Sequence, residues 1–302
     1  MNNKNTCILT LCFSVIALSG CNDTPSVTEL DLSANENGIL VNPTWVKENH
    51  EQLVLIDVRE ERAFNGGHIE GAISLSWQDL SNMSVASTEP GWGQLNAAEQ
   101  IQDLLQHKGV RQDQTAVVYT ESLKSWGDET RVAWSLQSAG MEIKILDGGI
   151  TAWENSGYAL SQEAINYSVS DFAIDALDDS INITTDELVA RINEVTILDT
   201  REASEHAGRK NYGEKYRGVI PNSIHTFFKD FYADNGKLKD ADTITAMMTE
   251  KGINKDDEIV VYCTGGVRST VAFYALQHAG FSNVRNYDGS FSDWTATEQP
   301  LG

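Results

Sequence analysis

Cys263 is the residue of this chain whose surroundings most suggest covalent chemistry. It follows the apolar run EIVVY and enters a turn with two glycines, and a helical pattern begins directly after the turn. Glycines let successive amide N–H groups point inward, and the helix start adds unpaired amides and partial positive charge. Such a cradle favours a thiolate and can hold an anion above it. A buried structural cysteine is the alternative. The predicted loop and cradle residues are Thr264, Gly265, Gly266, Val267, Arg268 and Ser269.

The other cysteines belong to the start of the chain. Residues 1–20 have a lysine and then a short apolar run, which is typical of a secretory signal and too short for a spanning helix. The run ends in LSGC, which resembles the lipobox of bacterial lipoproteins and implies a lipidated Cys21. An ordinary signal cleaved nearby is the alternative. Cys7 and Cys12 leave with the signal, so Cys263 is expected to be the free thiol of an exported protein.

The lipobox resemblance also implies a location. The mature chain is expected in the bacterial cell envelope, lipid-anchored and facing the periplasm. Asn22 rather than Asp follows Cys21, so the inner-membrane retention signal known for such lipoproteins is absent, which favours the outer membrane. Residues 21–39 are polar and are predicted to form a flexible tether.

A pattern of roughly 140 residues occurs twice, so it is a domain duplication rather than a short solenoid repeat. LVLIDVRE matches VTILDTRE, TAVVYT matches EIVVYC, and SLQSAG matches ALQHAG. Apolar strands that alternate with amphipathic helices indicate parallel sheets. We therefore predict an α/β protein of two tandem domains, each a parallel sheet with helices on both faces. The domains are expected at 40–158 and 181–302, with a linker at 159–180.

The elements around Cys263 resemble a known family. A strand, then Cys-x-x-x-x-Arg and a helix, preceded by Asp-x-Arg-Glu and Gly-x-Ile, is similar to the rhodanese family of sulfurtransferases. The resemblance covers both halves, and the tandem arrangement resembles thiosulfate and mercaptopyruvate sulfurtransferases. It implies an active C-terminal domain in which Cys263 carries a persulfide. It also implies small sulfur-containing anions as donors (thiosulfate, mercaptopyruvate or polysulfide) and a thiol or cyanide as acceptor.

The first domain lacks the same chemistry. Alignment of VVYTES on VVYCTG places Thr120 where Cys263 lies, and the next residues include Glu121, Asp128 and Glu129, which would repel an anion. This domain is therefore expected to be a structural partner that forms one wall of the cleft. Trp126 is a candidate for the shared interface, with an ordinary core or surface position as the alternative.

Two other functions remain open. Cysteine-loop phosphatases and arsenate reductases have one more residue between Cys and Arg, so the four-residue gap before Arg268 favours sulfur transfer. Tandem thiosulfate enzymes carry a lysine where this chain has Gly265. That absence leaves a sulfur carrier, which delivers persulfide sulfur to a partner protein with little turnover, as the second hypothesis.

Three arginines are candidates for substrate binding. Arg217, before the Gly-x-Ile turn, is the first choice, and Arg209 is the second. Arg201 comes two residues after Asp199. An arginine in this position more often forms an internal ion pair with the aspartate than it contacts the substrate.

Composition excludes several partners. The 22 Lys and Arg residues stand against 44 Asp and Glu, and the resulting net charge of -22 argues against nucleic acid. The six histidines show no zinc-ligand spacing, and no phosphate-loop or dinucleotide motif is present, so neither a metal nor a cofactor is expected. A monomer is expected.

Overall fold

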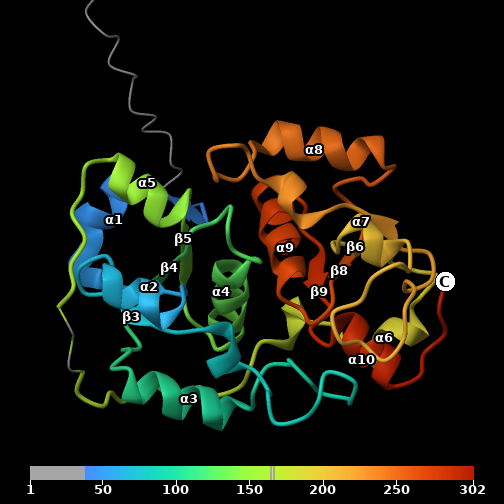
Figure 1. The fold of residues 1–302 in the computed structure, drawn as a ribbon, viewed down its shortest axis with the longest axis horizontal. Coiled ribbons are helices and arrows are strands. Elements are labelled where there is room, and N and C mark those ends of the chain that lie inside the picture. The colour runs from blue at the N-terminus through green and yellow to red at the C-terminus, as the bar shows by residue number, and fades with distance from the viewer. Residues whose placement is uncertain (1–37, 164, 166) are drawn as a thin grey trace, which may run out of the picture. The chain divides into compact units, whose positions relative to one another are not determined.

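The computed structural model describes residues 38–163, 165 and 167–302. The predicted signal, Cys21 and nearly all of the predicted tether lie outside the described residues, so those predictions stay predictions. The described part contains two parallel β-sheets, one from each half of the chain (Figure 1). The predicted α/β class with two tandem parallel-sheet domains is therefore confirmed.

The first sheet has five strands in the order β1-β5-β4-β2-β3. They are β1 (Leu40–Val41), β2 (Leu53–Asp57), β3 (Ile73–Ser74), β4 (Thr115–Tyr119) and β5 (Ile143–Leu146). The central strands β2 and β4 are apolar runs that are buried along nearly their whole length. Strands of this kind need cover on both faces.

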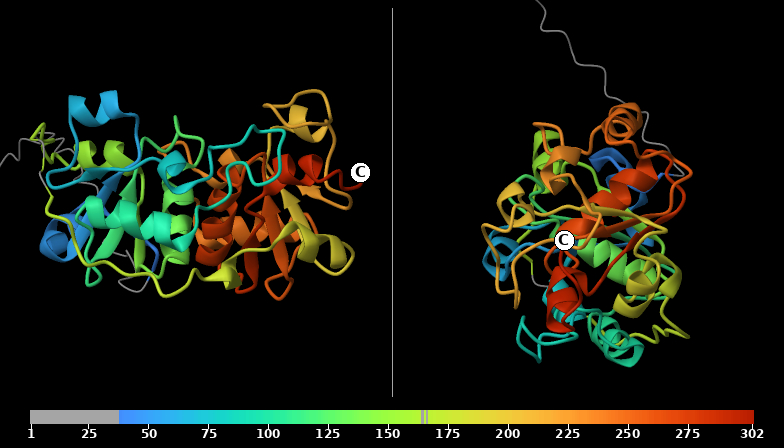
Figure 2. Two further views of the ribbon diagram at one scale, coloured as in Figure 1. Left: turned by 90° about the horizontal axis from the view of Figure 1, so that it is seen from below. Right: turned by 90° about the vertical axis from the view of Figure 1, so that its right-hand side faces the viewer.

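Helices supply that cover (Figure 2). The α-helices of the first domain are α1 (Pro43–Asn49), α2 (Glu61–Gly66), α3 (Ala98–His107), α4 (Asp128–Ser138) and α5 (Gly149–Asn155). Side chains of α1, α2 and α5 pack on the face that carries Leu55 and Val117. Those of α3 and α4 pack on the face that carries Ile56 and Val118. The side chains of successive residues in one strand thus pack against the helix layers on opposite faces of the sheet.

The second sheet repeats the plan with four strands in the order β7-β6-β8-β9. They are β6 (Thr196–Asp199), β7 (Ile224–His225), β8 (Ile259–Tyr262) and β9 (Val284–Asn286). The helices of this domain are α6 (Thr185–Ala190), α7 (Ala203–His206), α8 (Ala241–Glu250), α9 (Arg268–His278) and α10 (Ser290–Ala296). The face with Ile197 and Val260 packs against α6 and α10, and the face with Leu198 and Val261 packs against α8 and α9.

Short 3-10 helices complete the two domains. They are η1 (His50–Gln52), η2 (Trp77–Leu80), η3 (Asp179–Ile181) and η4 (Phe228–Phe231).

The helices α4 and α9 lie side by side between the two sheets (Figures 1 and 2). Each is buried on nearly every side, and one hydrophobic cluster runs through both domains across them. Polar side chains at this contact find partners, as buried polar groups must. The Thr130 and Thr270 hydroxyls lie 2.9 Å apart, and the Tyr274 hydroxyl donates to Gln137 Oε1 at 2.9 Å.

The segment between the domains is held to the first domain by ordered contacts. His68 and Ser161 form an antiparallel bridge. Phe172 is fully buried in the shared core, and its carbonyl accepts a hydrogen bond from Gln106 Nε2 at 2.7 Å. Its buried aromatic ring therefore fixes the path of this part of the chain.

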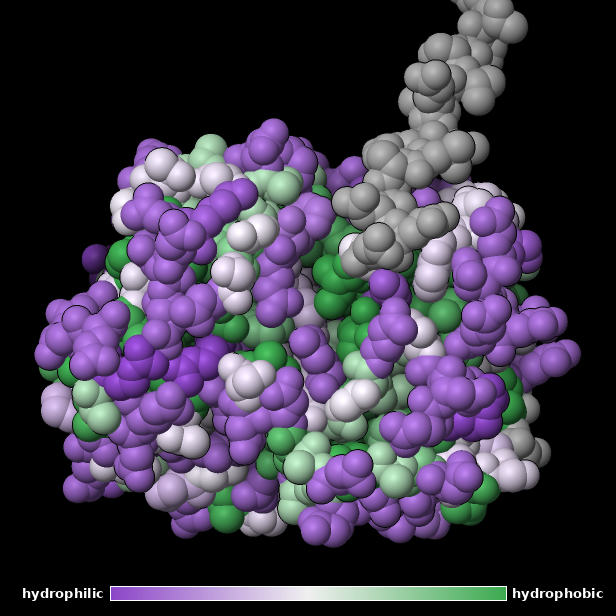
Figure 3. All heavy atoms as spheres, turned by 180° about the vertical axis from the view of Figure 1, so that it is seen from behind, coloured by the Kyte–Doolittle hydropathy of each residue, from purple (hydrophilic) through white to green (hydrophobic). Residues whose placement is uncertain are grey.

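Hydrophilic side chains cover much of the face drawn in Figure 3, with smaller hydrophobic patches between them. Among the described residues, no helix combines the length and apolar character needed to cross a membrane.

Glu129, at the start of α4, is a fully buried carboxyl at the domain interface. It accepts a hydrogen bond from the Tyr232 hydroxyl of the second domain at 2.9 Å, and Ser125 Oγ, which lies 2.8 Å from Asp128 Oδ2, is 3.0 Å from its Oε2. Burial raises the pKa of Glu129 from 4.5 to about 7, although its hydrogen bonds act in the opposite direction. The folded protein therefore holds this proton more tightly than the unfolded chain does.

We predict that Glu129→Gln removes a pH dependence of stability. Because the folded pKa is raised, the stability that Glu129 contributes is fully present below the unfolded pKa of the carboxyl and is lost as the pH rises through about 7. The variant should lack this loss, which is on the order of 2 kcal/mol. Urea unfolding at about pH 5 and pH 8 measures it, with the exposed Glu154→Gln as control. Equal pH dependence in wild type and Glu129→Gln would contradict the prediction.

Candidate active site

Cys263 lies directly after β8, and its side chain is only 1% exposed. The turn from Thr264 to Val267 leads into α9, and Gly266 has a left-handed backbone with φ 74°. Within residues 38–163, 165 and 167–302, no acceptor receives a hydrogen bond from the amides of this turn. Buried amides without acceptors are rare, so the turn presents donors to whatever sits beside the sulfur.

Serines and backbone bonds fix the cysteine itself. The Cys263 amide donates to Ser290 Oγ at 3.2 Å, and the Phe291 amide donates to the Cys263 carbonyl at 3.0 Å. Ser269 Oγ lies 3.7 Å from Cys263 Sγ and 2.6 Å from Asn286 Oδ1. A hydroxyl has one proton, so Ser269 donates to either the sulfur or the amide oxygen. Of the predicted loop residues, Ser269 therefore lies beside the sulfur at the start of α9.

Arg268 is not a free charge. Its Nη1 donates to Glu205 Oε2 at 2.6 Å and its Nη2 to Glu205 Oε1 at 2.9 Å, and both side chains are buried. Its Nη2 also donates to Thr264 Oγ1 at 2.6 Å, and the Thr264 hydroxyl in turn donates to Glu205 or Glu214. Burial lowers the pKa of Arg268, but Glu205 and the Cys263 sulfur outweigh this and raise the pKa above its ordinary value. The charge holds the loop in shape and is already balanced.

Aromatic rings cover the outer side of this arginine. The Arg268 guanidinium lies 5.2 Å from the centre of the Trp126 ring and 5.6 Å from that of Tyr212. Trp126 comes from the first domain, so the structure places it at the shared interface rather than in the core of its own domain. Its ring also stacks on Phe228 of the second domain.

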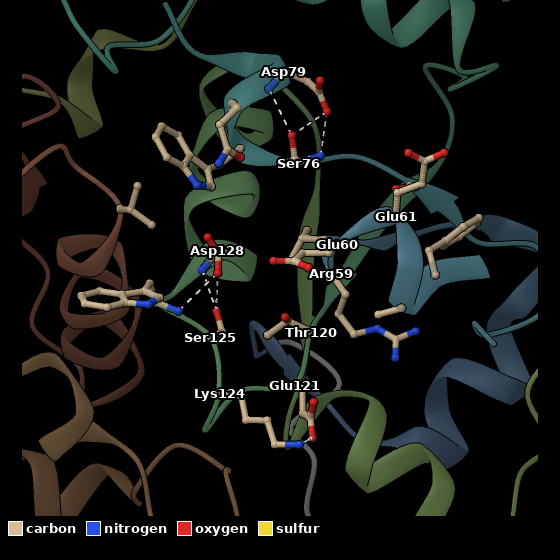
Figure 4. A pocket seen from close by; sticks show the side chains of 18 of the residues that line it. Arg59, Glu60, Glu61, Ser76, Asp79, Thr120, Glu121, Lys124, Ser125 and Asp128 are labelled. Carbon is tan, nitrogen blue, oxygen red and sulfur yellow. Dashed lines mark hydrogen bonds and ion pairs between the residues drawn. The ribbon is translucent and has the colours of Figure 1, made fainter. Parts of the chain in front are cut away.

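Cys263 opens into a pocket with a volume of about 1280 Å³ that both domains line. From the second domain come Cys263, Tyr212 and four residues of the predicted cradle: Thr264, Gly265, Val267 and Arg268. The first domain supplies the larger part of the wall, much of which is drawn in Figure 4. Those residues are Val58, Arg59, Glu60, Glu61, Ala63, Phe64, Asn65, Ser74, Ser76, Trp77, Gln78, Asp79, Trp92, Lys108, Thr120, Glu121, Lys124, Ser125, Trp126 and Asp128.

The loop of the first domain that matches the Cys263 loop faces the same pocket. Thr120 and Glu121 line it, as does Asp128, which begins α4 as Arg268 begins α9. Figure 4 shows Ser125 bonded to Asp128 and Lys124 paired with Glu121 on this wall. The first domain thus contributes carboxylates where the second has its cradle.

None of the three arginines predicted to bind substrate lines the pocket. Arg201 is buried, and its Nε and Nη2 donate to Asp199 at 2.9 and 2.8 Å while Nη2 also reaches the Gly218 carbonyl. Burial raises the pKa of Asp199, but its bonds from His206 and Arg201 outweigh this and lower the pKa below its ordinary value. Arg209 and Arg217 are exposed and lie outside the lining. The prediction that one of these arginines binds substrate gains no support from the pocket lining and stays a prediction.

Arg131 is an interface residue that the sequence did not reveal. This fully buried guanidinium of α4 reaches Asp288 Oδ1 of the second domain at 2.5 Å through Nη1. Its Nη2 donates to the Gly93 carbonyl at 2.9 Å, and its Nη1 lies 3.5 Å from the Gly266 carbonyl inside the predicted cradle. One side chain of the first domain therefore holds the cradle and the segment that carries Trp92.

The segment around Trp92 crosses to the second domain. The Gly91 amide donates to Asp293 Oδ1 at 2.9 Å and the Leu95 amide to Asp288 Oδ2 at 2.8 Å. A side chain at Gly265 would come within 2.7 Å of the Trp92 ring, so this glycine is required for close approach. Trp92 therefore forms a wall of the pocket directly against the cysteine loop.

A metal centre has no support in the part of the chain that the structure describes. No group of three or more His, Cys, Asp or Glu side chains in residues 38–163, 165 and 167–302 is placed to hold a metal ion.

Comparison with known proteins identifies the repeated unit. The family model of the rhodanese-like domain matches residues 42–156 and 184–297, one match in each half. The matches cover strands β2 to β5 of the first sheet and all four strands of the second, and each match ends one residue after the helix that follows the last strand.

Curated relatives match nearly the whole chain at low identity. A protein of Mycolicibacterium smegmatis named "Putative thiosulfate sulfurtransferase" is 28% identical over 269 residues, which cover 85% of this chain and 94% of that protein. The "Sulfur carrier protein TtuD" of Thermus thermophilus is 26% identical over 274 residues, covering 85% of this chain and 93% of that protein.

Solved structures share the fold. The anaerobic ergothioneine biosynthesis enzyme from Chlorobium limicola superposes with a TM-score of 0.76 at 19% identity, covering 87% of this chain and 69% of that one. YnjE superposes with a TM-score of 0.76 at 21% identity, covering 87% and 68%.

We predict that Arg131→Met destabilises the protein by about 3–5 kcal/mol, because Asp288 would keep a buried charge without its partner. The double variant Arg131→Met/Asp288→Asn should recover a large part of this loss. Arg111→Met, at an exposed arginine of the same domain, should change stability by no more than about 0.5 kcal/mol. Urea unfolding measures all three, and a similar cost at Arg131 and Arg111 would refute the bridging role.

Proposed function

The chain belongs to the rhodanese-like domain family, and on that premise we propose that it is a sulfurtransferase that works through a persulfide on Cys263. The Cys263 thiolate attacks the outer sulfur of a donor such as thiosulfate. A bond forms between the two sulfurs, and the donor's own S–S bond breaks with its electron pair leaving on sulfite. The persulfide then passes its outer sulfur to a thiol or to cyanide.

The observation that carries this proposal is the set of amides without acceptors beside a buried cysteine. A persulfide anion beside Cys263 would receive hydrogen bonds from the turn of Thr264 to Val267 and the positive end of α9. Arg268 is already paired with Glu205, so it shapes the loop and adds little net charge. Neutral amide donors are thus the main source of stabilisation for the transferred sulfur.

We predict that Cys263 gains one sulfur atom when the protein is treated with thiosulfate and loses it to cyanide. Intact-mass measurement should show the added sulfur on the wild type and none on Cys263→Ser. The variant keeps every other cysteine of the chain, so sulfur bound elsewhere would still appear on it. Equal sulfur on both proteins, or none on the wild type with thiosulfate, mercaptopyruvate or polysulfide, would refute the proposal.

A sulfur carrier is the second candidate function. It is supported by the relative named "Sulfur carrier protein TtuD" and by a pocket whose cations are mostly paired, which suits rapid turnover of a small anion poorly. Rapid loading of Cys263 with negligible steady-state thiosulfate:cyanide turnover would favour the carrier over the enzyme. A cysteine-loop phosphatase or arsenate reductase fits less well, because those enzymes have one more residue between the cysteine and the arginine than the four that separate Cys263 from Arg268.

We also propose that the mature chain is anchored to the bacterial cell envelope by a lipid on Cys21 and faces the periplasm, with the outer membrane favoured. The support is the LSGC sequence followed by Asn22. Expression of the full chain in a bacterium fed radiolabelled palmitate should label the wild type and not Cys21→Ser. Equal labelling of the two proteins would contradict lipidation at this residue.

A further inference from the structure

We propose that the sulfur acceptor is an organic thiol that carries a positively charged amino or ammonium group. This inference rests on the proposed function, because it names the acceptor class for the same pocket. It follows from the charge of the pocket wall, from the aromatic faces in it and from its size.

The cations of the wall are largely occupied. Arg59 is paired with the buried Asp57 through Nε and Nη2 at 2.9 and 2.6 Å. Arg268 is paired with Glu205, and Lys124 lies 2.6 Å from Glu121. Lys108 donates to the Ser74 carbonyl and, among the described residues, has no carboxylate partner. An incoming anion therefore meets few available positive charges.

Fewer of the carboxylates that line the wall are paired with cations. Glu60 and Glu61 are exposed and form no ion pair with any described residue. Asp79 accepts from Ser76, and Asp128 accepts from Ser125, so neither loses its negative charge to a cation. Figure 4 shows the Glu60 carboxylate on the side of the pocket that faces Asp128, with the Arg59 guanidinium pointing away from them. The first-domain side of the pocket is therefore net negative.

Aromatic faces line the same space. The Trp92 ring lies against Gly265, and the Trp77 and Trp92 rings meet edge to face with centres 6.4 Å apart. Trp126 and Phe64 also contribute to the lining, but the Trp126 ring already lies beside the Arg268 guanidinium and the Phe64 ring stacks on His68, so the aromatic contribution rests on Trp77 and Trp92. Aromatic faces attract ammonium groups, and nearby carboxylates add to that attraction.

The size of the pocket points to an organic molecule. Its volume of about 1280 Å³ exceeds the roughly 300–1,000 Å³ of pockets that bind drug-sized ligands, and it far exceeds what an inorganic sulfur anion fills. A cationic thiol would use the carboxylates and rings for its charged end and place its sulfur beside Cys263.

The transfer step needs no further reagent. The acceptor thiolate attacks the outer sulfur of the Cys263 persulfide, and a new S–S bond forms on the acceptor. The bond between Cys263 Sγ and the outer sulfur breaks, and its electron pair stays on the Cys263 thiolate. The acceptor leaves as its own persulfide, and the enzyme returns to its starting state.

The first test needs no persulfide. Two methanethiosulfonate reagents, one with a trimethylammonium group and one with a sulfonate, are allowed to modify Cys263, with Cys263→Ser reporting reaction at other cysteines. Each rate is divided by that of the same reagent with free mercaptoethanol. We expect the cationic reagent to react about tenfold faster or more at low salt, with the ratio falling as salt is added. Equal rates, or a faster anionic reagent, would overturn the inference.

The second test follows the loaded protein. Persulfide on Cys263 is discharged by cysteamine, mercaptoethanol or mercaptopropionate at equal thiolate concentration, since thiolate is the attacking species. Cysteamine should discharge it fastest and mercaptopropionate slowest. The double variant Glu60→Gln/Glu61→Gln should reduce this spread about threefold or more, whereas Glu99→Gln, an exposed carboxylate outside the pocket, should leave it unchanged.

The outcomes separate this inference from the proposed function. A protein that loads sulfur on Cys263 but shows no preference for cationic thiols refutes the acceptor class alone. A protein that never loads sulfur refutes the sulfurtransferase and the acceptor together, and the reagent rates then still report whether the pocket selects cations. If the double variant leaves the difference in discharge rates among the three thiols unchanged, Glu60 and Glu61 do not cause the preference. That result would overturn the role of the first-domain wall.

Discussion

The packing of α4 against α9 is the constraint on which the rest of the site depends. Each helix follows the loop at the carboxyl end of the central strand of its own sheet, so their contact brings both loops to one pocket. Because the contact is buried, its polar groups must pair across it, as the Thr130 and Thr270 hydroxyls do. Arg131 extends this pairing to Asp288 and to the cradle carbonyl of Gly266. The first domain therefore cannot be removed without changing the environment of Cys263.

The duplication separates what the fold needs from what the chemistry needs. The Asp-x-Arg motif makes the same contacts in both halves: Arg59 bonds Asp57 and the Gly67 carbonyl, and Arg201 bonds Asp199 and the Gly218 carbonyl. A contact kept in the half that has Thr120 in place of the cysteine serves structure, because it ties the end of a strand to the following loop. The chemical difference lies in the two loops, where one half has carboxylates and the other has amides without acceptors.

Local sequence patterns predicted the helices and strands well. The spacing of apolar residues over a short stretch shows which side of a helix or strand is buried. The two sheets, the position of Cys263 after a strand and the start of α9 at Arg268 are as expected.

Pairings between residues that are distant in the sequence were missed. Arg131 meets Asp288 across 157 positions, and Arg268 meets Glu205 across 63, so no local spacing signals either pair. The arginines Arg201, Arg209 and Arg217 were chosen for charge near the turn, and the sequence does not show whether such a charge is paired or lies in the pocket. Trp92 comes from an irregular segment, whose path depends on the second domain.

The distribution of charge in the pocket gives the proposed reaction a direction. The amides and the start of α9 make the end beside Cys263 favourable for negative charge, while Glu60, Glu61 and Asp128 make the first-domain wall favourable for positive charge. An acceptor with a thiolate at one end and an ammonium group at the other is aligned by that gradient with its sulfur toward the persulfide. Alignment before reaction lowers the entropic part of the barrier, which a uniformly charged pocket would not do. An anionic donor has no such help from the wall, so its loading must rely on the amides alone. The same pocket that stabilises the bound sulfur therefore discriminates between the two half-reactions, and the discriminating carboxylates come from the domain that has Thr120 in place of the cysteine.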